Sequence, residues 1–398
     1  MHSSQHILCI AFYIEGTGLT RVISELIAQF KNSHNVHLLG VGYQGPVIKQ
    51  GNCTIYPTNL NGGDIMAAHA AHAMVLDLEP EYVFILHDAW HFQRYMAVFS
   101  DIRHLSSYIG YVPIDGEVVD PNSVEPLTHL DNLVLYTEWA RNQVSQAMLK
   151  IAPEEKLPKT TVIGHGVDLK TFYPLPNKVE AKAAVFPNEP SESFIILNAS
   201  RPCIRKRIDI TLQAFAAFAK NKPSYVKLCL HQAISEAQSS ELQSLINQLN
   251  IAPRILHNPL SKKHGNVLSD SQLNLLYNAC DIGVNSSMGE GWGLISFEHA
   301  ATGAAQIVPN HTACGPLWKN AAHLLPCENS NIGQISPFIM QQPTVNSLTA
   351  AFEKLYQDTK YRNSIASQCL KTSHQHPWAT INQQWQNLLK EQSLTPLP

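Results

Sequence analysis

The stretch DIGVNSSMGEGWGLISFEHAA, residues 281–301, joins a short apolar run, a loop of small residues and a second apolar run with helical spacing. Its first residues are typical of a strand that is buried on both faces. Gly289, Gly291 and Gly293 then let the backbone approach a ligand closely, and we expect a helix to begin near Leu294. Such a helix presents free N–H groups and the positive end of its dipole to an anion. The stretch therefore predicts a strand–loop–helix unit with a ligand at its loop.

The same alternation of strand and helix patterns runs along the whole chain. Short apolar runs bounded by turn residues predict strands at residues 6–12, 36–42, 82–87, 108–114, 133–136, 160–163, 194–198, 226–231, 254–257, 281–285 and 305–308. Amphipathic patterns between them predict helices, for example at residues 19–31, 210–219 and 272–279. Because continuous apolar runs suit a parallel sheet, we predict an α/β protein with doubly wound, Rossmann-like domains.

The length of the chain favours two such domains, because 398 residues exceed what one ordinary core accommodates. A stretch rich in proline and polar residues, 171–193, interrupts the alternation. We therefore predict an N-terminal domain at residues 1–175 and a C-terminal domain at residues 176–378. The amphipathic end of the chain, within residues 379–398, predicts a helix that packs back toward the N-terminal domain.

The charge and cysteine content argue against several partners. Lys and Arg number 28 against 31 Asp and Glu, so the net charge of −3 leaves no cationic excess for a nucleic-acid backbone. The eight cysteines form no Cys-x-x-Cys pair, which favours a reduced, cytoplasmic protein. No apolar run approaches the ~20 residues of a membrane span, and no signal-peptide pattern begins the chain. We expect a cytoplasmic protein without integral membrane contact or nucleic acid.

Charged residues follow two strands of the predicted C-terminal domain. In SRPCIRKRID, residues 200–209, Arg201 and Lys206 supply two cations that suit an anionic ligand. A solvated basic loop is the alternative. Glu290 and Glu298 lie in the loop and helix of the opening stretch, and two carboxylates so placed suit hydroxyl groups better than one phosphate. The alternative is that both are ordinary solvated charges.

The first half of the chain offers weaker signals. Gly16 and Gly18 lie in a turn between a strand and a helix, but Arg21 replaces the third glycine of a dinucleotide fingerprint, so a nicotinamide oxidoreductase is disfavoured. The segment HDAWH, residues 87–91, ends another strand, where open α/β sheets bind ligands. His87 is thus a candidate for a ligand contact, with a satisfied strand-end histidine as the alternative and a metal ligand as a minor one.

These stretches together resemble the retaining glycosyltransferases with the GT-B fold, in particular the family numbered four and its E-x7-E signature. The resemblance extends from Gly16 to about Trp378 and implies two Rossmann-like domains that face each other across a cleft. It implies that Glu290 contacts the hydroxyls of the donor sugar and that Glu298 binds the ribose. Donor contacts are further implied for Gly16, Gly18, Gly291, Trp292, Gly293 and Leu294.

Three further stretches follow the family pattern in order. Residues 200–209 resemble its GR-x4-KG turn, although Arg207 replaces the glycine and either shifts the turn or adds a third cation. Residues 162–174, VIGHGVDLKTFYP, resemble the end of the first domain, with His165 in place of an asparagine. Residues 268–281 resemble the helix that precedes the donor loop.

One departure concerns the acceptor side. Many family members have a histidine after the strand that follows the HDAWH segment, whereas this chain has VPIDGE at residues 112–117. Asp115, Glu117 or His87 could supply that polar contact. The chain has no Asp-x-Asp pair, the usual metal clamp of a nucleotide diphosphate, and the cations and helix N-terminus can replace it. We therefore expect no metal and no cofactor beyond the nucleotide-sugar co-substrate.

The resemblance predicts a retaining, metal-independent transfer of a sugar from a nucleotide-sugar donor to a hydroxyl-bearing acceptor. The catalytic candidates are Glu290, Arg201, Lys206, His87 and Asp115. A catalytically weak GT-B module that binds nucleotide sugars, and an enzyme that resembles sucrose synthase or uses a sugar phosphate, are the alternatives. The helix expected near residues 19–34 carries few cations, which favours a sugar or other small-molecule acceptor over a lipid. Base recognition is expected near residues 231–234 and 258–260.

Overall fold

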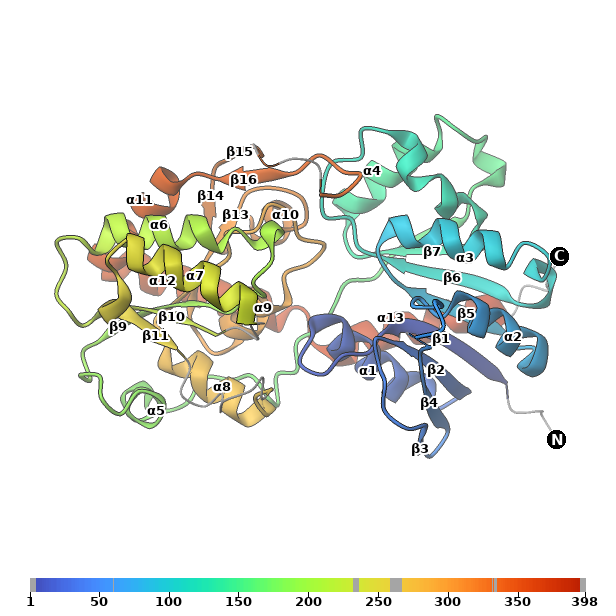
Figure 1. Cartoon of the computed structure of the whole chain (residues 1–398), viewed down its shortest axis with the longest axis horizontal. Coiled ribbons are helices and arrows are strands. Elements are labelled where there is room, and N and C mark those ends of the chain that lie inside the picture. Colours follow the sequence, from blue (N-terminus) through green and yellow to red (C-terminus); the bar gives the residue numbers. More distant parts are fainter. Residues whose placement is uncertain are drawn as a thin grey trace. The chain divides into compact units, whose positions relative to one another are not determined.

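The structure, a computed structural model, describes residues 5–59, 61–231, 236–257, 267–330, 332 and 335–393. The chain divides into two compact units (Figure 1). Unit 1 comprises Met1–His165 together with Trp378–Pro398, and unit 2 comprises Gly166–Pro377. Across the described ranges, no helix is both long and apolar enough to cross a membrane.

Unit 1 is built on an eight-stranded sheet with the order β3-β4-β2-β1-β5-β6-β7-β8. All neighbouring pairs are parallel except β3 and β4. The strands are β1 His6–Phe12, β2 Asn35–Val41, β3 Ile48–Gln50, β4 Cys53–Pro57, β5 Tyr82–Leu86, β6 Ser107–Val112, β7 Asn132–Leu135 and β8 Lys159–Val162. The helices are α1 Gly18–Phe30, α2 Ala68–Leu78, α3 Phe92–Val98, α4 Glu138–Met148 and α13 Trp378–Ser393, with short 3-10 turns that include η1 Ala89–His91, η2 Arg103–Leu105, η3 Pro121–His129 and η4 Glu154–Lys156.

The C-terminal helix α13 belongs to unit 1, and its second tryptophan, Trp385, enters the core of that unit. Trp385 is fully buried, and its ring centroid lies 5.4 Å from Phe84 of β5, 4.9 Å from Tyr111 of β6 and 6.0 Å from Phe30 of α1. Replacing a buried tryptophan with alanine typically costs about 3–5 kcal/mol. The last helix of the chain is therefore a structural part of the first unit.

Unit 2 contains a six-stranded parallel sheet with the order β11-β10-β9-β12-β13-β14 and a small antiparallel pair, β15 and β16. Its strands are β9 Phe194–Asn198, β10 Val226–Leu230, β11 Ile255–His257, β12 Ile282–Val284, β13 Ala305–Pro309, β14 His323–Leu325, β15 Cys327–Asn329 and β16 Gln341–Pro343. The helices are α5 Lys178–Val185, α6 Ile208–Ala219, α7 Glu236–Gln248, α8 Asp270–Ala279, α9 Leu294–Ala301, α10 Cys314–Trp318, α11 Val345–Gln357 and α12 Thr359–His374, with 3-10 turns η5 Ile204–Lys206 and η6 Ala252–Arg254. In Figure 1, α6 and α7 lie on one side of this sheet and α5 and α8 on the other.

The pairing of strands decides which loops meet. In unit 2, β9 pairs with β12 in parallel, with Leu197 opposite Gly283. The loops that leave the carboxyl ends of these two strands therefore start side by side, at the edge where open α/β sheets bind ligands. In unit 1, β1 and β5 are parallel neighbours in the same way, with Ala11 opposite Leu86. This brings the glycine turn after β1 next to the HDAWH segment after β5.

Candidate functional site

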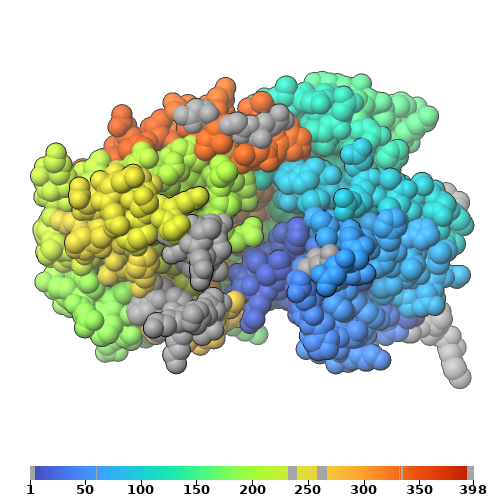
Figure 2. All heavy atoms as spheres, in the orientation of Figure 1, coloured from blue at the N-terminus to red at the C-terminus, as the bar shows by residue number. Residues whose placement is uncertain are grey.

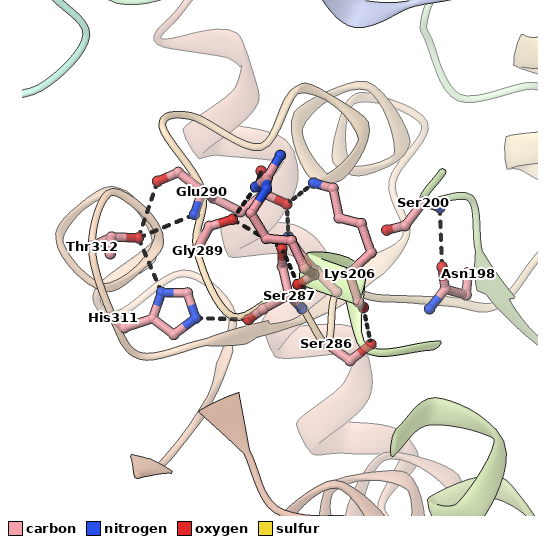
Figure 3. Close-up of polar contacts among 11 residues, drawn as sticks. Asn198, Ser200, Lys206, Ser286, Ser287, Gly289, Glu290, His311 and Thr312 are labelled. Atoms are coloured by element: carbon pink, nitrogen blue, oxygen red, sulfur yellow. Dashed lines mark hydrogen bonds and ion pairs between the residues drawn. The ribbon is translucent and has the colours of Figure 1, made fainter. Parts of the chain in front are cut away.

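The centre of the candidate site in unit 2 is an ion pair between the two adjacent loops (Figure 3). Lys206 ends η5, after β9, and its Nζ donates to Oε1 of Glu290 at 2.5 Å. Glu290 lies in the loop after β12, and the same Oε1 accepts a hydrogen bond from Nδ2 of Asn285 at 3.1 Å. Lys206 is 8% exposed and Glu290 is 7% exposed. The structure thus brings together two of the residues that the sequence predicts.

A second cation lies beside this pair. Nη1 of Arg205 is 3.7 Å from Oε2 of Glu290 and also donates to the main-chain oxygen of Gly289. Arg201, by contrast, is exposed, and in the described part of the chain it is not within ion-pair distance of Glu290. Sequence reasoning missed Arg205 because the five-residue spacing of the family turn selects positions 201 and 206. The run of three basic residues at 205–207 was the available signal.

The charges around Glu290 hold it in its ionised form. Burial raises the pKa of its carboxyl, but the charges of Lys206 and Arg205 and hydrogen bonds from Lys206 and Asn285 outweigh that effect and lower the pKa to about 2. Burial lowers the pKa of the Lys206 ammonium from its ordinary 10.5, and the attraction of Glu290 offsets this only in part. Glu290 is therefore a carboxylate at neutral pH, with oxygens that can accept hydrogen bonds from hydroxyl groups.

The backbone of the acidic loop is fixed by buried polar side chains. Oγ of Ser286 donates to the main-chain oxygens of Lys206 and Arg207, each at 2.9 Å, which joins this loop to the basic turn. On the other side, Nε2 of His311 lies 2.7 Å from the main-chain oxygen of Ser287. Thr312 donates from Oγ1 to the main-chain oxygen of Glu290 at 3.0 Å. These contacts, several of them drawn in Figure 3, hold Glu290 in one position.

The helix that follows the loop confirms the expected strand–loop–helix unit. Gly293 adopts a left-handed conformation with φ +92°, which favours glycine, and α9 begins at Leu294 as the sequence predicts. Glu298 is buried in α9, and its Oε2 accepts a hydrogen bond from the Tyr277 hydroxyl at 3.2 Å. Trp292 is 4% exposed and stacks on Phe297 at 5.1 Å between centroids. The indole thus packs in the core of unit 2, while the main-chain groups of the loop stay partly exposed at Gly291 and Gly293.

In unit 1, His87 follows β5 and is fully buried. Its ring packs against Phe12, at 4.7 Å between centroids, and against His91 and Tyr95 at 5.4 and 5.6 Å. Burial, followed by the charge of His91, lowers the pKa of His87 to about 3, so the imidazole is neutral at pH 7. Neither ring nitrogen has a hydrogen-bond partner among the described residues.

The other candidate residues of unit 1 lie at the same edge of its sheet. Asp115 follows β6 and is 7% exposed, whereas Glu117 is exposed. Gly16 has φ +78° in the exposed turn after β1, and Gly18 is the first residue of α1. The helix is capped by Thr17, whose Oγ1 accepts from the main-chain N–H of Thr20 at 3.3 Å. Strand β5 pairs with both β1 and β6, so these four residues follow the two strands that flank the one before His87.

Two further expectations concern metal and base recognition. The described ranges contain no group of three or more His, Cys, Asp or Glu side chains that could hold a metal ion. Of the segments expected near the base, residues 232–234 and 258–260 lie outside the described residues. The main-chain N–H of His231, which follows β10, donates to Asn198 at 3.1 Å, and burial lowers the pKa of its ring to about 4.

No protein-family model and no curated protein sequence matches the chain. Solved structures match it over nearly its full length. Sucrose-phosphate synthase from Thermosynechococcus elongatus superimposes with a TM-score of 0.77 at 16% identity, covering 97% of this chain and 98% of that one. A glycosyltransferase from Rickettsia africae gives 0.73 at 15% identity, covering 99% and 100%. HepE from Anabaena, in complex with UDP and glucose, gives 0.70 at 15% identity, covering 97% and 100%.

At sequence identities this low, the similarity to these solved structures shows the fold alone. The two sheets of this chain, parallel except for the β3–β4 pair, are those of GT-B glycosyltransferase structures, which confirms the predicted fold class.

Proposed function

We propose that the chain is a retaining glycosyltransferase that moves a sugar from a nucleotide-sugar donor to a hydroxyl-bearing acceptor without a metal ion. The observation that carries the proposal is the buried pair of Lys206 and Glu290 at the carboxyl edge of β9 and β12. A buried ion pair is weak evidence for stability, because desolvation of both charges opposes their attraction. Charged groups held in this way at a ligand-binding edge are candidates for function.

The cations suit a leaving diphosphate. The Lys206 ammonium has three N–H donors and uses one of them on Glu290, so the others can bind phosphate oxygens. Arg205 contributes a second fixed positive charge, and we include Arg201 as an exposed cation that reaches the same anion. The N-terminus of α9 adds main-chain donors from the segment at residues 291–294. Together these groups stabilise the charge that grows on the nucleoside diphosphate as the glycosidic bond breaks.

The carboxylates suit the hydroxyl groups of the donor. Glu290 remains ionised because its pKa is about 2, and it can accept hydrogen bonds from sugar hydroxyls while its position is fixed by Asn285 and Thr312. Glu298, one helical turn into α9, is assigned to the ribose. Trp292 supports the loop through its packing on Phe297, and the donor contact at this position is made by the main chain.

The acceptor-side groups are assigned to unit 1. We propose that His87 and Asp115 make polar contacts to the acceptor. Gly16 and Gly18 are assigned to the donor, because they let the turn after β1 approach it closely. In the transfer, the bond between the anomeric carbon and the diphosphate oxygen breaks, and the acceptor oxygen bonds to that carbon on the same face. The acceptor proton passes to the leaving phosphate oxygen, which balances the reaction without a protein base.

The comparisons support a nucleotide-sugar donor. The HepE structure contains UDP and glucose, so UDP-glucose is the first donor to test. The likeness to sucrose-phosphate synthase favours a second reading of the acceptor, a sugar phosphate. Membership of family four and the role of its E-x7-E signature at Glu290 and Glu298 belong to this proposal as well. We assign the protein no cofactor other than the nucleotide sugar.

The test is turnover by purified protein with UDP-, ADP- and GDP-sugars, each offered with glucose, fructose and their 6-phosphates. We expect one donor to release nucleoside diphosphate in an acceptor-dependent manner, and the acceptor that is consumed separates the two readings. Glu290→Gln should reduce turnover by at least 100-fold, comparable to the loss of one electrostatic group at a transition state. Glu353→Gln, at a surface ion pair with Lys222, is the matched control and should remain active. Turnover by Glu290→Gln at the wild-type rate would refute the assignment, and donor binding without turnover would favour a binding module.

A further inference from the structure

Arg207, the residue after Lys206, has an unusual backbone. It adopts the left-handed conformation with φ +46° and ψ +48°, between the end of η5 and the start of α6. Glycine tolerates positive φ without strain. A side chain with a β-carbon in this conformation is strained, and such strain persists only where surrounding contacts compensate for it.

The compensating contacts of Arg207 are specific. Its Nε lies 3.0 Å from Oδ1 of Asp209 and its Nη2 lies 2.8 Å from Oδ2, a two-point pairing. Its remaining nitrogen, Nη1, donates to Oε1 of Gln342. Gln342 lies in β16 and is 5% exposed. The guanidinium therefore ties the basic turn to a strand more than a hundred residues away in the sequence.

The strand pair β15–β16 in turn holds the acidic loop. The main-chain N–H of Gln341 donates to the oxygen of Met288 at 3.3 Å, and Met288 donates from its own N–H to the oxygen of Arg205 at 2.8 Å. Oγ of Ser330 donates to Oε1 of Gln342 at 3.2 Å and lies 3.3 Å from Sδ of Met288. These contacts connect three segments in a ring. The basic turn contacts β16, β16 contacts the acidic loop, and the acidic loop contacts the basic turn.

The strand pair lies at the surface of its unit. In Figure 1, β15 and β16 lie outside the six-stranded sheet, and the orange surface of unit 2 in Figure 2 belongs to the part of the chain that contains them. Its strands are short and polar, with little apolar side chain to bury in the core. Several of its described hydrogen bonds run to the two loops of the candidate site.

We propose that Arg207 and Gln342 are positioning residues of the donor site: they lock the basic turn to β16 so that Lys206 faces Glu290 and the diphosphate at a fixed distance. This inference rests on the proposed function, because it assigns these contacts among the basic turn, β16 and the acidic loop to donor binding. Neither side chain touches the ion pair itself. Loss of their mutual contact would let the turn and the acidic loop move independently and would weaken diphosphate binding.

The test compares Arg207→Gly, Gln342→Ala and the double variant with wild type. Glycine removes the guanidinium and relieves the strained backbone, so folding is preserved. Asn250→Gly is the matched control, since Asn250 is exposed in unit 2 and has φ +55°. We expect each single variant to bind the cognate nucleoside diphosphate 5- to 20-fold more weakly by calorimetry, and the double variant to be no weaker than either, because both remove one contact. Asn250→Gly should bind like wild type.

A merely structural role gives a different pattern. In that case the thermal midpoint of Arg207→Gly or Gln342→Ala falls while the dissociation constant stays within twofold of wild type, and the inference is overturned. Additive losses in the double variant would also overturn it. If Arg207→Gly does not fold, Gln342→Ala alone decides by the same criterion. If the wild type binds no nucleoside diphosphate, the proposed function itself is refuted. If the wild type binds one and the variants bind it equally well, only the inference about Arg207 and Gln342 is refuted.

Discussion

Nζ of Lys206 lies 2.5 Å from Oε1 of Glu290, and the side chains are 10% and 9% exposed. The two residues are 84 positions apart in the sequence, and the parallel pairing of β9 with β12 brings their loops together. Apolar side chains of similar volume could fill the same space without removing two charges from water. Packing alone therefore does not explain why this pair is buried. The pair is therefore best explained by a ligand that needs both a cation and a hydrogen-bond acceptor.

Replacement of Lys206 by glutamine should weaken binding of the nucleoside diphosphate by about 1.5–3 kcal/mol, the value of a hydrogen bond to a charged group. The amide keeps a donor for Glu290 but loses the positive charge that the diphosphate requires. Calorimetry on the folded variant measures the change. Lys222→Gln, which removes the cation of the 2.6 Å pair with Glu353, is the control. An affinity equal to wild type in Lys206→Gln would count against the diphosphate assignment.

Arg205 and Arg201 should respond differently to the same substitution. Arg205→Gln loses contacts to Gly289 and Glu290, so it should lower both the thermal midpoint and the diphosphate affinity. Arg201→Gln should leave the midpoint unchanged and weaken binding most at low salt, because an exposed charge is screened. Thermal unfolding and binding titrations at two ionic strengths test both statements. Wild-type affinity in Arg201→Gln at low salt would remove Arg201 from the site.

The depressed pKa of Glu290 predicts a specific acid dependence. Its folded pKa of about 2 lies below its ordinary 4.5, so its ionisation contributes stability that is present above pH 4.5 and is lost as the pH falls toward 2. The difference in unfolding free energy between wild type and Glu290→Gln should therefore be constant from pH 7 to 5.5 and shrink by about 1.4 kcal/mol at pH 3.5. Urea titrations of both proteins measure it. A difference that does not change with pH would show that Glu290 is not held ionised by its neighbours.

His165 predicts acid sensitivity in unit 1. Burial lowers its pKa from 6.5 to about 3, and its Nδ1 lies 2.7 Å from the Tyr111 hydroxyl. The unfolded chain takes up a proton that the folded state excludes, so stability falls as the pH drops below 6.5. Between pH 7.5 and pH 5, the free energy of unfolding of His165→Asn should fall by about 2 kcal/mol less than that of wild type.

The control for that comparison is His129→Asn, because His129 is about half exposed. Urea unfolding at the two pH values supplies the free energies. If His165→Asn is as sensitive to acid as wild type, another group causes the loss.

The strands of the two main sheets were largely predictable because parallel strands buried on both faces appear as continuous apolar runs. The predicted strands at residues 6–12 and 194–198 have the observed bounds, and the others differ by one or two residues at an end. The short polar strands β15 and β16 were missed, since their pairing depends on main-chain hydrogen bonds and leaves no apolar pattern. The short strands β3 and β14 were also missed, and so was β4, whose buried and partly exposed residues alternate and form no continuous apolar run.

Residues of the candidate site were predictable only where their distance in sequence from a strand fixes their place in the fold. Lys206 and Glu290 follow strands at fixed distances, and the structure brings them together. Arg205 and Gln342 carry no such signal, because their roles depend on which side of a turn or strand faces the loop. The packing of Trp292 on Phe297 likewise depends on the path of the loop into α9.

The central claim is that Lys206 and Glu290 bind a diphosphate-linked sugar, and a crystal structure of the protein with the nucleoside diphosphate that binds most tightly tests it most directly. We predict a phosphate oxygen about 2.7–3.2 Å from Nζ of Lys206, with the loop that begins α9 against the same group. Diphosphate bound elsewhere on the protein, with the Lys206–Glu290 pair untouched, would contradict the account.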